Sequence, residues 1–151
     1  MFLINKITKK QIIYAILILI WMAIVFAFSN QPADNSSQSS GRITEIVMKI
    51  IAKEPAKRTQ ELTDMVETIV RKTAHFSLYA VGGFLMAGLV NTTKVSNKKL
   101  IIYAIFFTTL YACTDEIHQL FVDGRSGEIR DVLIDGTGAT LGTMLYLLTK
   151  K

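Results

Sequence analysis

The chain has 151 residues, half of them hydrophobic, with 17 Lys and Arg against 12 Asp and Glu. This length suits a single domain over residues 1–151, and the hydrophobic fraction makes a membrane protein the first class to test. The net charge of +5 does not predict nucleic-acid binding, because the basic residues are not gathered on one face with aromatic residues between them. With Cys113 as its one cysteine, the chain can form neither an intrachain disulfide nor a zinc knuckle.

Residues 11–29 (QIIYAILILIWMAIVFAFS) are almost wholly apolar and follow a start that carries three lysines and no acid. As a helix they would be about 28 Å long, close to the roughly 30 Å hydrocarbon core of a bilayer, so we predict a transmembrane helix. A signal peptide is the alternative, because Ala27 and Ser29 are spaced like a weak cleavage site. Bulky aromatic residues late in the segment argue against it.

Residues 30–72 are polar and begin with a stretch rich in Ser and Asn, residues 30–41, which predicts a loop. Over residues 42–53, isoleucines and a valine recur at helical spacing opposite charged residues. The pattern predicts an amphipathic helix with Ser39 or Ser40 as its N-cap. This helix is too short to span a bilayer.

A second amphipathic helix is predicted over residues 60–70, starting near Thr59 and separated from the first by Pro55. Both amphipathic helices carry one apolar side. Such a side can lie on the membrane surface or pack on the transmembrane helices, and the pattern alone favours neither.

Three further apolar segments are long enough to span a bilayer, over residues 73–90, 100–117 and 132–149. With the first segment they predict an all-α protein, a bundle of four transmembrane helices with one or two amphipathic helices between the first and second spans. The multi-pass pattern predicts residence in a cell membrane, with the lipid bilayer as a partner.

The charges predict the orientation of this bundle. The N-terminal segment, the turn over residues 91–99 and the C-terminal end together hold eight lysines and none of the 12 acids. Because positive residues concentrate in cytoplasmic segments, we predict that both termini are cytoplasmic and that residues 30–72 and 118–131 are extracytoplasmic.

Polar side chains enter all four apolar segments at their predicted outer ends. Residues three or four apart share one face of a helix. The expected faces are Arg71 or Lys72 with His75, Tyr79 and Gly82; Tyr111, Asp115, His118 and Gln119; and Asp131 and Asp135 with Gly138 and Gly142. The G-x-x-x-G spacing of Gly138 and Gly142 would let a neighbouring helix approach the Asp135 face closely.

A carboxylate at membrane depth costs about 2.5–3.5 kcal/mol unless it is paired or solvated. Asp115 and Asp135 should therefore have partners, which we expect among the basic residues Arg71, Lys72, His75, His118, Arg125 and Arg130. One interpretation is that such pairs have a structural role alone and hold the bundle together. Buried ion pairs stabilise poorly compared with apolar packing, however, which favours a functional site.

The chain resembles the VanZ-like family of small bacterial membrane proteins, named for an accessory determinant of resistance to the glycopeptide teicoplanin. The motifs that carry the resemblance are Phe28, Ser29 and Gln31; Arg71, Lys72, Ala74, His75, Phe76 and Tyr79; Asp115, Glu116, His118, Gln119, Phe121, Gly124 and Arg125; Asp131, Val132, Asp135, Gly138 and Gly142. Asp123 departs from the pattern, where a proline is expected. The resemblance implies an integral membrane protein whose polar motifs face outward.

Three functions fit these residues. We rank first an envelope factor with a ligand site, which changes the access of an antibiotic or enzyme to cell-wall precursors, with a lipid-linked precursor or a glycopeptide as the expected ligand. The predicted ligand-binding residues are Arg71, Lys72, His75, Tyr79, Asp115, Glu116, His118, Gln119, Arg125, Asp131 and Asp135. The cations among them, with Arg130, suit a phosphate group.

Second is a membrane enzyme that acts on a lipid-linked or phosphate-bearing substrate. Its candidate acid–base residues are His75, Asp115, Glu116, His118 and Asp135. A metal variant would use His75, His118 and Asp115, but two histidines without a thiolate are a poor set, so we predict no cofactor. A transporter ranks last, because the inner halves of the spans carry no ionisable pair that would continue a route.

Overall fold

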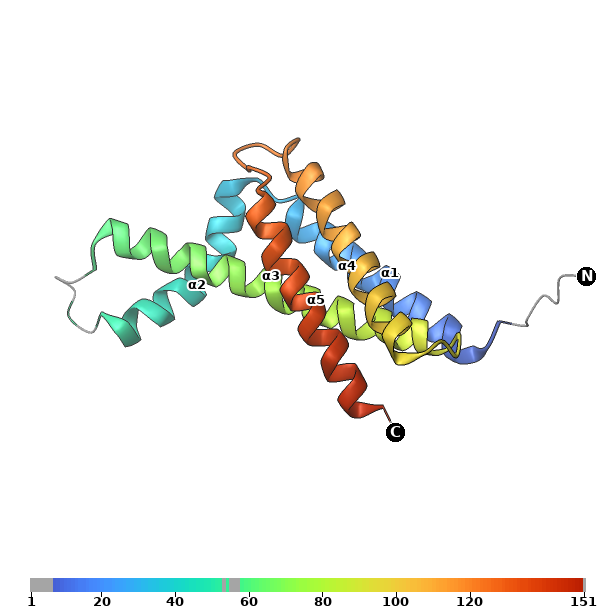
Figure 1. The fold of residues 1–151 in the computed structure, drawn as a ribbon. Helices are drawn as coiled ribbons and strands as arrows, with labels where there is room; N and C mark the ends of the chain where they lie inside the picture. The colour runs from blue at the N-terminus through green and yellow to red at the C-terminus, as the bar shows by residue number, and fades with distance from the viewer. Residues whose placement is uncertain (1–6, 53, 55–57, 151) are drawn as a thin grey trace, which may run out of the picture.

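The computed structural model describes residues 7–52, 54 and 58–150, with the backbone alone over residues 33–39. This part of the chain forms five α-helices and contains no strand (Figure 1). The helices are α1 (Lys9–Ser29), α2 (Ala33–Ile51), α3 (Gln60–Asn91), α4 (Asn97–Gln119) and α5 (Ile129–Thr149). The predicted all-α class is confirmed.

Four of these helices, α1, α3, α4 and α5, are long and apolar enough to cross a membrane. The chain is thus a multi-pass membrane protein associated with the lipid bilayer. Side-chain caps fix where three of the helices begin: Thr8, Thr59 and Ser96 each accept a hydrogen bond from the backbone N–H three residues later. Each of these three spans therefore begins on capped polar residues, two or more residues before its apolar run.

The second span is longer than predicted. Residues 60–70 and 73–90 belong to one helix, α3, with 32 residues and a length of about 48 Å. Thr59 caps this helix as predicted, but no break follows near residue 72. The physical reason is that Arg71, Lys72 and His75 are compatible with a helix and interrupt only its apolar pattern. Because a hydrocarbon core is roughly 30 Å thick, the first turns of α3 extend beyond it.

One separate amphipathic helix, α2, thus lies between the first two spans, and it begins earlier than predicted. The predicted loop over residues 30–41 is wrong: α2 starts at Ala33, after Pro32, so neither Ser39 nor Ser40 caps it. It ends at Ile51, while the predicted end at Lys53 and the separating Pro55 lie outside the described residues. Ser40 is buried and donates a hydrogen bond to Glu67 on α3 (3.4 Å), so tertiary contact compensates for the poor helix propensity of this stretch.

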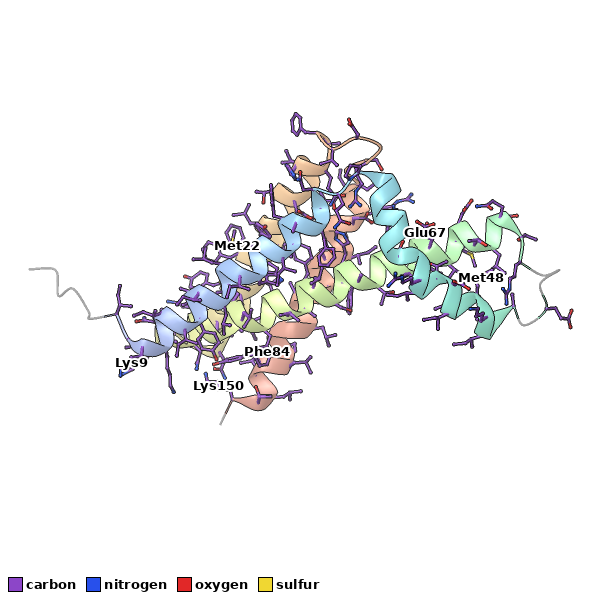
Figure 2. The ribbon with its side chains drawn as sticks, turned by 180° about the vertical axis from the view of Figure 1, so that it is seen from behind. Lys9, Met22, Met48, Glu67, Phe84 and Lys150 are labelled. Atoms are coloured by element: carbon purple, nitrogen blue, oxygen red, sulfur yellow. The ribbon has the colours of Figure 1, made fainter. Side chains whose placement is uncertain are left out.

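The contact between α2 and α3 uses only part of the predicted apolar sides. Thr44, Met48 and Val66 are buried between the two helices. The isoleucines of α2, Ile43, Ile46, Ile50 and Ile51, are exposed, and so are Met65 and Ile69 of α3. We call α2 with residues 60–70 of α3 the arm, and it projects away from the other helices (Figures 1 and 2).

Helices α3 and α5 cross at close range in the middle of the bundle (Figure 1). A Cβ atom added at Gly138 or Gly142 would overlap the backbone of α3 at Phe76 or Ala80. One added at Gly83 would overlap the carbonyl oxygen of Ala139 on α5. The glycines therefore let the two backbones touch, as the G-x-x-x-G spacing predicts.

Aromatic side chains join α1 to the rest of the bundle. Trp21 packs edge-on against Tyr79, with ring centroids 5.6 Å apart, and its indole N–H donates to the carbonyl oxygen of Leu78 (2.8 Å). Tyr111 of α4 donates its hydroxyl to the carbonyl oxygen of Met22 (2.8 Å). The indole N–H and the phenol hydroxyl thus each donate to a backbone carbonyl oxygen, so burying these rings leaves no polar group unsatisfied.

The four spans alternate in direction, so the lysines gather at one end of the bundle. We call this the lysine end; among the described residues it carries Lys9, Lys10, Lys94, Lys98, Lys99 and Lys150. Figure 2 shows Lys9 and Lys150 there, away from the arm with Met48 and Glu67. The cytoplasmic location of this end stays a prediction.

Candidate functional site

A cleft of about 420 Å³ lies at the opposite end of the bundle, where the arm meets the start of α5 and the loop that follows α4. Its lining residues are Thr68, Arg71, Lys72, His75, Gln119, Gly124, Arg125, Ser126, Glu128, Arg130, Asp131, Ile134 and Asp135. Twelve of these thirteen are polar or glycine, in a chain that is half apolar. The cleft is therefore a polar site at the end of an apolar bundle.

An ion pair at the cleft wall joins α3 to α5. Lys72 contacts Asp131 directly, and its ammonium nitrogen lies 3.8 Å from the Glu128 carboxylate. All three side chains are partly exposed, so the pair contributes about 1 kcal/mol or less to stability. The pair therefore places Lys72 against the two acids at the start of α5.

Buried acids beneath the cleft are connected by hydrogen bonds from Ser29 and Gln119. Asp115 accepts from the hydroxyl of Ser29 on α1 (2.8 Å) and from the amide of Gln119 (3.3 Å). The same amide donates to Glu116 (3.1 Å), and Arg125 donates from two nitrogens to the Gln119 carbonyl oxygen (3.2 and 2.7 Å). The network thus ties α1 and α4 to the loop that carries Arg125.

The loop after α4 directs Arg125 into the cleft. Gly124 has a φ of 72°, a left-handed conformation that glycine adopts without strain, and the Arg125 N–H donates to the carbonyl oxygen of Val122 (3.1 Å). Burial lowers the pKa of the Arg125 guanidinium, and the nearby positive charge of Arg71 lowers it further. Two guanidinium groups that line one cleft and repel each other favour a bound anion between them.

Three buried polar groups in or beneath the cleft lack hydrogen-bond partners among the described residues. They are the Asp135 carboxylate, the His75 Nδ1 atom and the Tyr79 hydroxyl. Asp135 and Tyr79 are fully buried, and His75 Nδ1 lies 3.7 Å from Asp135 Oδ2, beyond hydrogen-bond distance. Because buried polar groups in folded proteins are nearly always satisfied, such a cluster indicates a functional position.

His75 and Asp135 also form a potential metal-binding group with Glu116. One ligand atom from each residue lies within 4.8 Å of the others. The sequence pattern led us to consider His75, His118 and Asp115 instead. His118 lies on the other side of α4, where its ring stacks on Phe26 of α1 with centroids 4.7 Å apart.

The structure thus separates the predicted ligand-binding residues into three groups. Seven line the cleft: Arg71, Lys72, His75, Gln119, Arg125, Asp131 and Asp135. Tyr79, Asp115 and Glu116 are buried and do not line it. His118 lies apart from it, within 3.3 Å of the Asn30 side-chain oxygen.

Sequence reasoning did not single out several residues of the cleft. Thr68 continues the stripe of Arg71, His75 and Tyr79 by one turn, so the 3–4 spacing would have found it had α3 been recognised as continuous. Glu128 precedes α5, and its backbone N–H donates to Glu116 (2.9 Å). No spacing rule indicates that contact, because it joins a loop to a helix.

An apolar groove of about 240 Å³ adjoins the cleft on the side of α1 and α2. Its lining residues are Phe28, Gln31, Ser40, Ile43, Val70, Arg71, Ala74, His75, Leu78 and Arg125. Arg71, His75 and Arg125 line both the groove and the cleft. The basic residues therefore stand at the junction of a polar and an apolar cavity.

A comparison with protein families matches residues 14–150 to the family model described as VanZ/LLP1. No curated protein and no solved structure matches the chain. The match covers nearly all of the chain, from within α1 to the end of α5, and so includes every element of the cleft. The chain belongs to the VanZ/LLP1 family.

Proposed function

We propose that this protein is a cell-envelope factor that binds an anionic, lipid-linked ligand, the phosphate group in the cleft and the hydrocarbon chain in the groove. A lipid-linked cell-wall precursor has this chemistry. Binding would change the access of enzymes or antibiotics to such precursors, in line with the association of the family with teicoplanin-type resistance. The observation that carries the proposal is the junction of cleft and groove at Arg71, His75 and Arg125.

The charge of the cleft supports a phosphate ligand. Arg71 and Arg130 line the cleft and have no ion pair within the described part of the chain, and Arg125 stands across from Arg71. Guanidinium groups bind phosphate oxygens through paired hydrogen bonds, and a partly buried site strengthens these bonds. A glycopeptide, by contrast, is a large polar molecule, and the adjoining apolar groove does not suit it.

The surroundings of the groove support a lipid chain. The exposed isoleucines of α2 lie on the arm, and Ile43 among them also lines the groove. An apolar face of this kind on a membrane protein suits contact with the bilayer rather than with water. A chain that leaves the groove past Ile43 would thus pass into lipid. In the predicted orientation, this lipid is the outer leaflet.

Binding to purified protein in a phosphate-free detergent tests the proposal. The probes are a long-chain polyprenyl phosphate, the uncharged polyprenol of the same length, and inorganic phosphate, each in buffer with a metal chelator. We expect polyprenyl phosphate to bind best and each of the other two at least about tenfold more weakly, because each lacks one half of the ligand. Arg71→Ala and Arg125→Ala should each weaken polyprenyl phosphate binding by about tenfold.

Lys98→Ala at the lysine end is the matched control, since it removes the same charge from an exposed position away from the cleft. It should leave binding unchanged. Equal affinity for polyprenol and polyprenyl phosphate, or equal loss in Lys98→Ala, would contradict the proposal.

A cellular assay extends this test to the envelope. If the cleft is the working site, His75→Ala, Asp115→Asn and Arg125→Ala should abolish a teicoplanin-susceptibility phenotype while protein levels in the membrane stay close to wild type. Loss of folded protein in all three variants would instead mean that these residues only stabilise the bundle.

A membrane enzyme is the second candidate, favoured by the closeness of His75 and Asp135 at the bottom of the cleft. An imidazole beside a buried carboxylate is a common general-base arrangement. Release of inorganic phosphate or diphosphate from a polyprenyl diphosphate by wild type, and its loss in His75→Ala, would favour the enzyme. Binding without turnover would favour the binding factor.

A further inference from the structure

We propose that His75, Glu116 and Asp135 bind one divalent transition-metal cation, of the zinc or manganese class, at the buried end of the cleft. The three residues come from α3, α4 and α5, and their ligand atoms lie within 4.8 Å of one another. A small movement of the side chains brings such atoms to the ligand distances of about 2.0–2.2 Å that zinc requires. We expected no cofactor from the sequence, and this geometry is the reason to infer one.

The unsatisfied state of Asp135 is the second observation behind the proposal. Its side chain is fully buried, and neither of its oxygens has a hydrogen-bond donor among the described residues. His75 Nδ1 faces the same carboxylate at 3.7 Å, also without a partner. An isolated buried carboxylate is strongly unfavourable, and a divalent cation shared by these groups removes that cost.

Glu116 is held in place as metal-binding carboxylates usually are. Its Oε2 accepts from the backbone N–H of Glu128 (2.9 Å) and its Oε1 accepts from Gln119 (3.1 Å), which Arg125 in turn holds. Each carboxylate oxygen keeps a lone pair beyond these bonds. Such supporting hydrogen bonds orient a ligand and raise metal affinity.

The donor set determines the class of metal. One imidazole nitrogen with two carboxylates suits zinc or manganese, whereas magnesium and calcium prefer oxygen ligands alone. Three protein ligands leave a coordination position open, as in catalytic zinc sites, and His75 and Asp135 line the cleft. If the ligand is the phosphate of the proposed function, one of its oxygens would take that position.

Metal content of the purified protein tests the site directly, without any lipid ligand. Wild-type protein is stripped with a chelator, incubated with Zn²⁺, Mn²⁺ or Mg²⁺, desalted and measured by elemental mass spectrometry. We expect about one equivalent of Zn²⁺ or Mn²⁺ and little Mg²⁺. Co²⁺ substitution should give the visible absorption of a site with one nitrogen and several oxygen ligands. Less than about 0.1 equivalent of metal in wild type would overturn the proposal.

Variants locate the metal within the cleft. Asp135→Asn and Glu116→Gln should each lower affinity at least about tenfold, since loss of a supporting residue alone costs 10- to 100-fold. Asp131→Asn is the matched control, a cleft carboxylate outside the group of three, and it should keep one equivalent. Equal loss in Asp131→Asn, or full retention in Asp135→Asn and Glu116→Gln, would overturn the site.

Folding of each variant is checked by gel filtration and thermal melting. If Asp135→Asn does not fold, Glu116→Gln alone decides, and one equivalent of bound metal in Glu116→Gln would overturn the site. The lipid-binding test above is run in chelator and so reports on the proposed function alone. Polyprenyl phosphate binding without metal binding would overturn only the metal site, and the reverse result only the lipid ligand.

Discussion

The two ends of the bundle use the same four helices in different ways. At the lysine end the charged side chains are mostly exposed. One polar contact there is a hydrogen bond from Lys150, which follows α5, to Asn97 (3.0 Å). At the cleft end Asp115, Glu116 and Asp135 are buried and connected across α1, α3, α4, α5 and a loop. The lysine end shows that these helices can end without buried charge.

The difference favours a role for the acids of the cleft end beyond closing the bundle. Between the two ends, glycine contacts of α3 with α5 and the aromatic contacts of Trp21 hold the spans together. Buried acids add little stability to such a frame. The proposed ligand site would account for their presence at one end alone, and variants can test each part of this comparison.

The largest effect on stability is expected where α3 and α5 cross, between the two ends of the bundle. Gly142→Ala places a methyl group into the backbone of α3 at Ala80, so the helices must separate. We expect a loss of at least about 3 kcal/mol, or loss of folded protein, measured by thermal melting in detergent. Gly136→Ala on the same helix is the control, because its methyl group meets Thr109 at an ordinary 3.4 Å. Similar melting of the two variants would contradict the crossing.

A smaller effect is expected at the buried network of the cleft end. Ser29→Ala removes the hydroxyl that donates to Asp115 and should cost about 1–3 kcal/mol, because a buried acid loses its nearest donor. Ser77→Ala is the control, since its exposed hydroxyl bonds only to the carbonyl of Thr73 in its own helix. The difference between the two melting temperatures measures how much the Ser29–Asp115 hydrogen bond contributes to stability. Equal melting temperatures would show that this hydrogen bond contributes nothing.

The smallest effect on stability is expected from cysteines that report orientation. In a Cys113→Ala background, Glu61→Cys on the arm should react with a membrane-impermeant thiol reagent in intact cells. Lys98→Cys at the lysine end should react only after lysis. Both positions are exposed, so neither variant should melt differently from wild type. The reverse labelling pattern would overturn the predicted cytoplasmic location of the lysine end.

The apolar runs were enough to predict four spans, because hydrophobic length is a local property of the sequence. The boundaries were harder to predict, since charged residues such as Arg71 interrupt an apolar pattern without ending a helix. The helix over the Ser-rich stretch was missed because it depends on burial of Ser40 and Thr44 against α3. Propensity does not report a contact of that kind.

Helical spacing predicted six of the thirteen residues that line the cleft, among them Arg71, Lys72 and His75 on α3. It did not distinguish Glu116 from His118, which are two residues apart on α4 and point to different neighbours. Which of them faces the cleft depends on the rotation of α4 in the bundle. That rotation is set by packing between helices, on which the pattern of one helix gives no information.

The continuity of α3 has a mechanical consequence. Residues 60–81 contain neither proline nor glycine, so this length of helix bends little. Thr68, Arg71, Lys72 and His75 all lie on it, and the nearest pair of glycines, Gly82 and Gly83, comes after them. The arm and one wall of the cleft therefore belong to one stiff length of helix. A displacement of the arm would therefore move the arginine and histidine of the cleft with it.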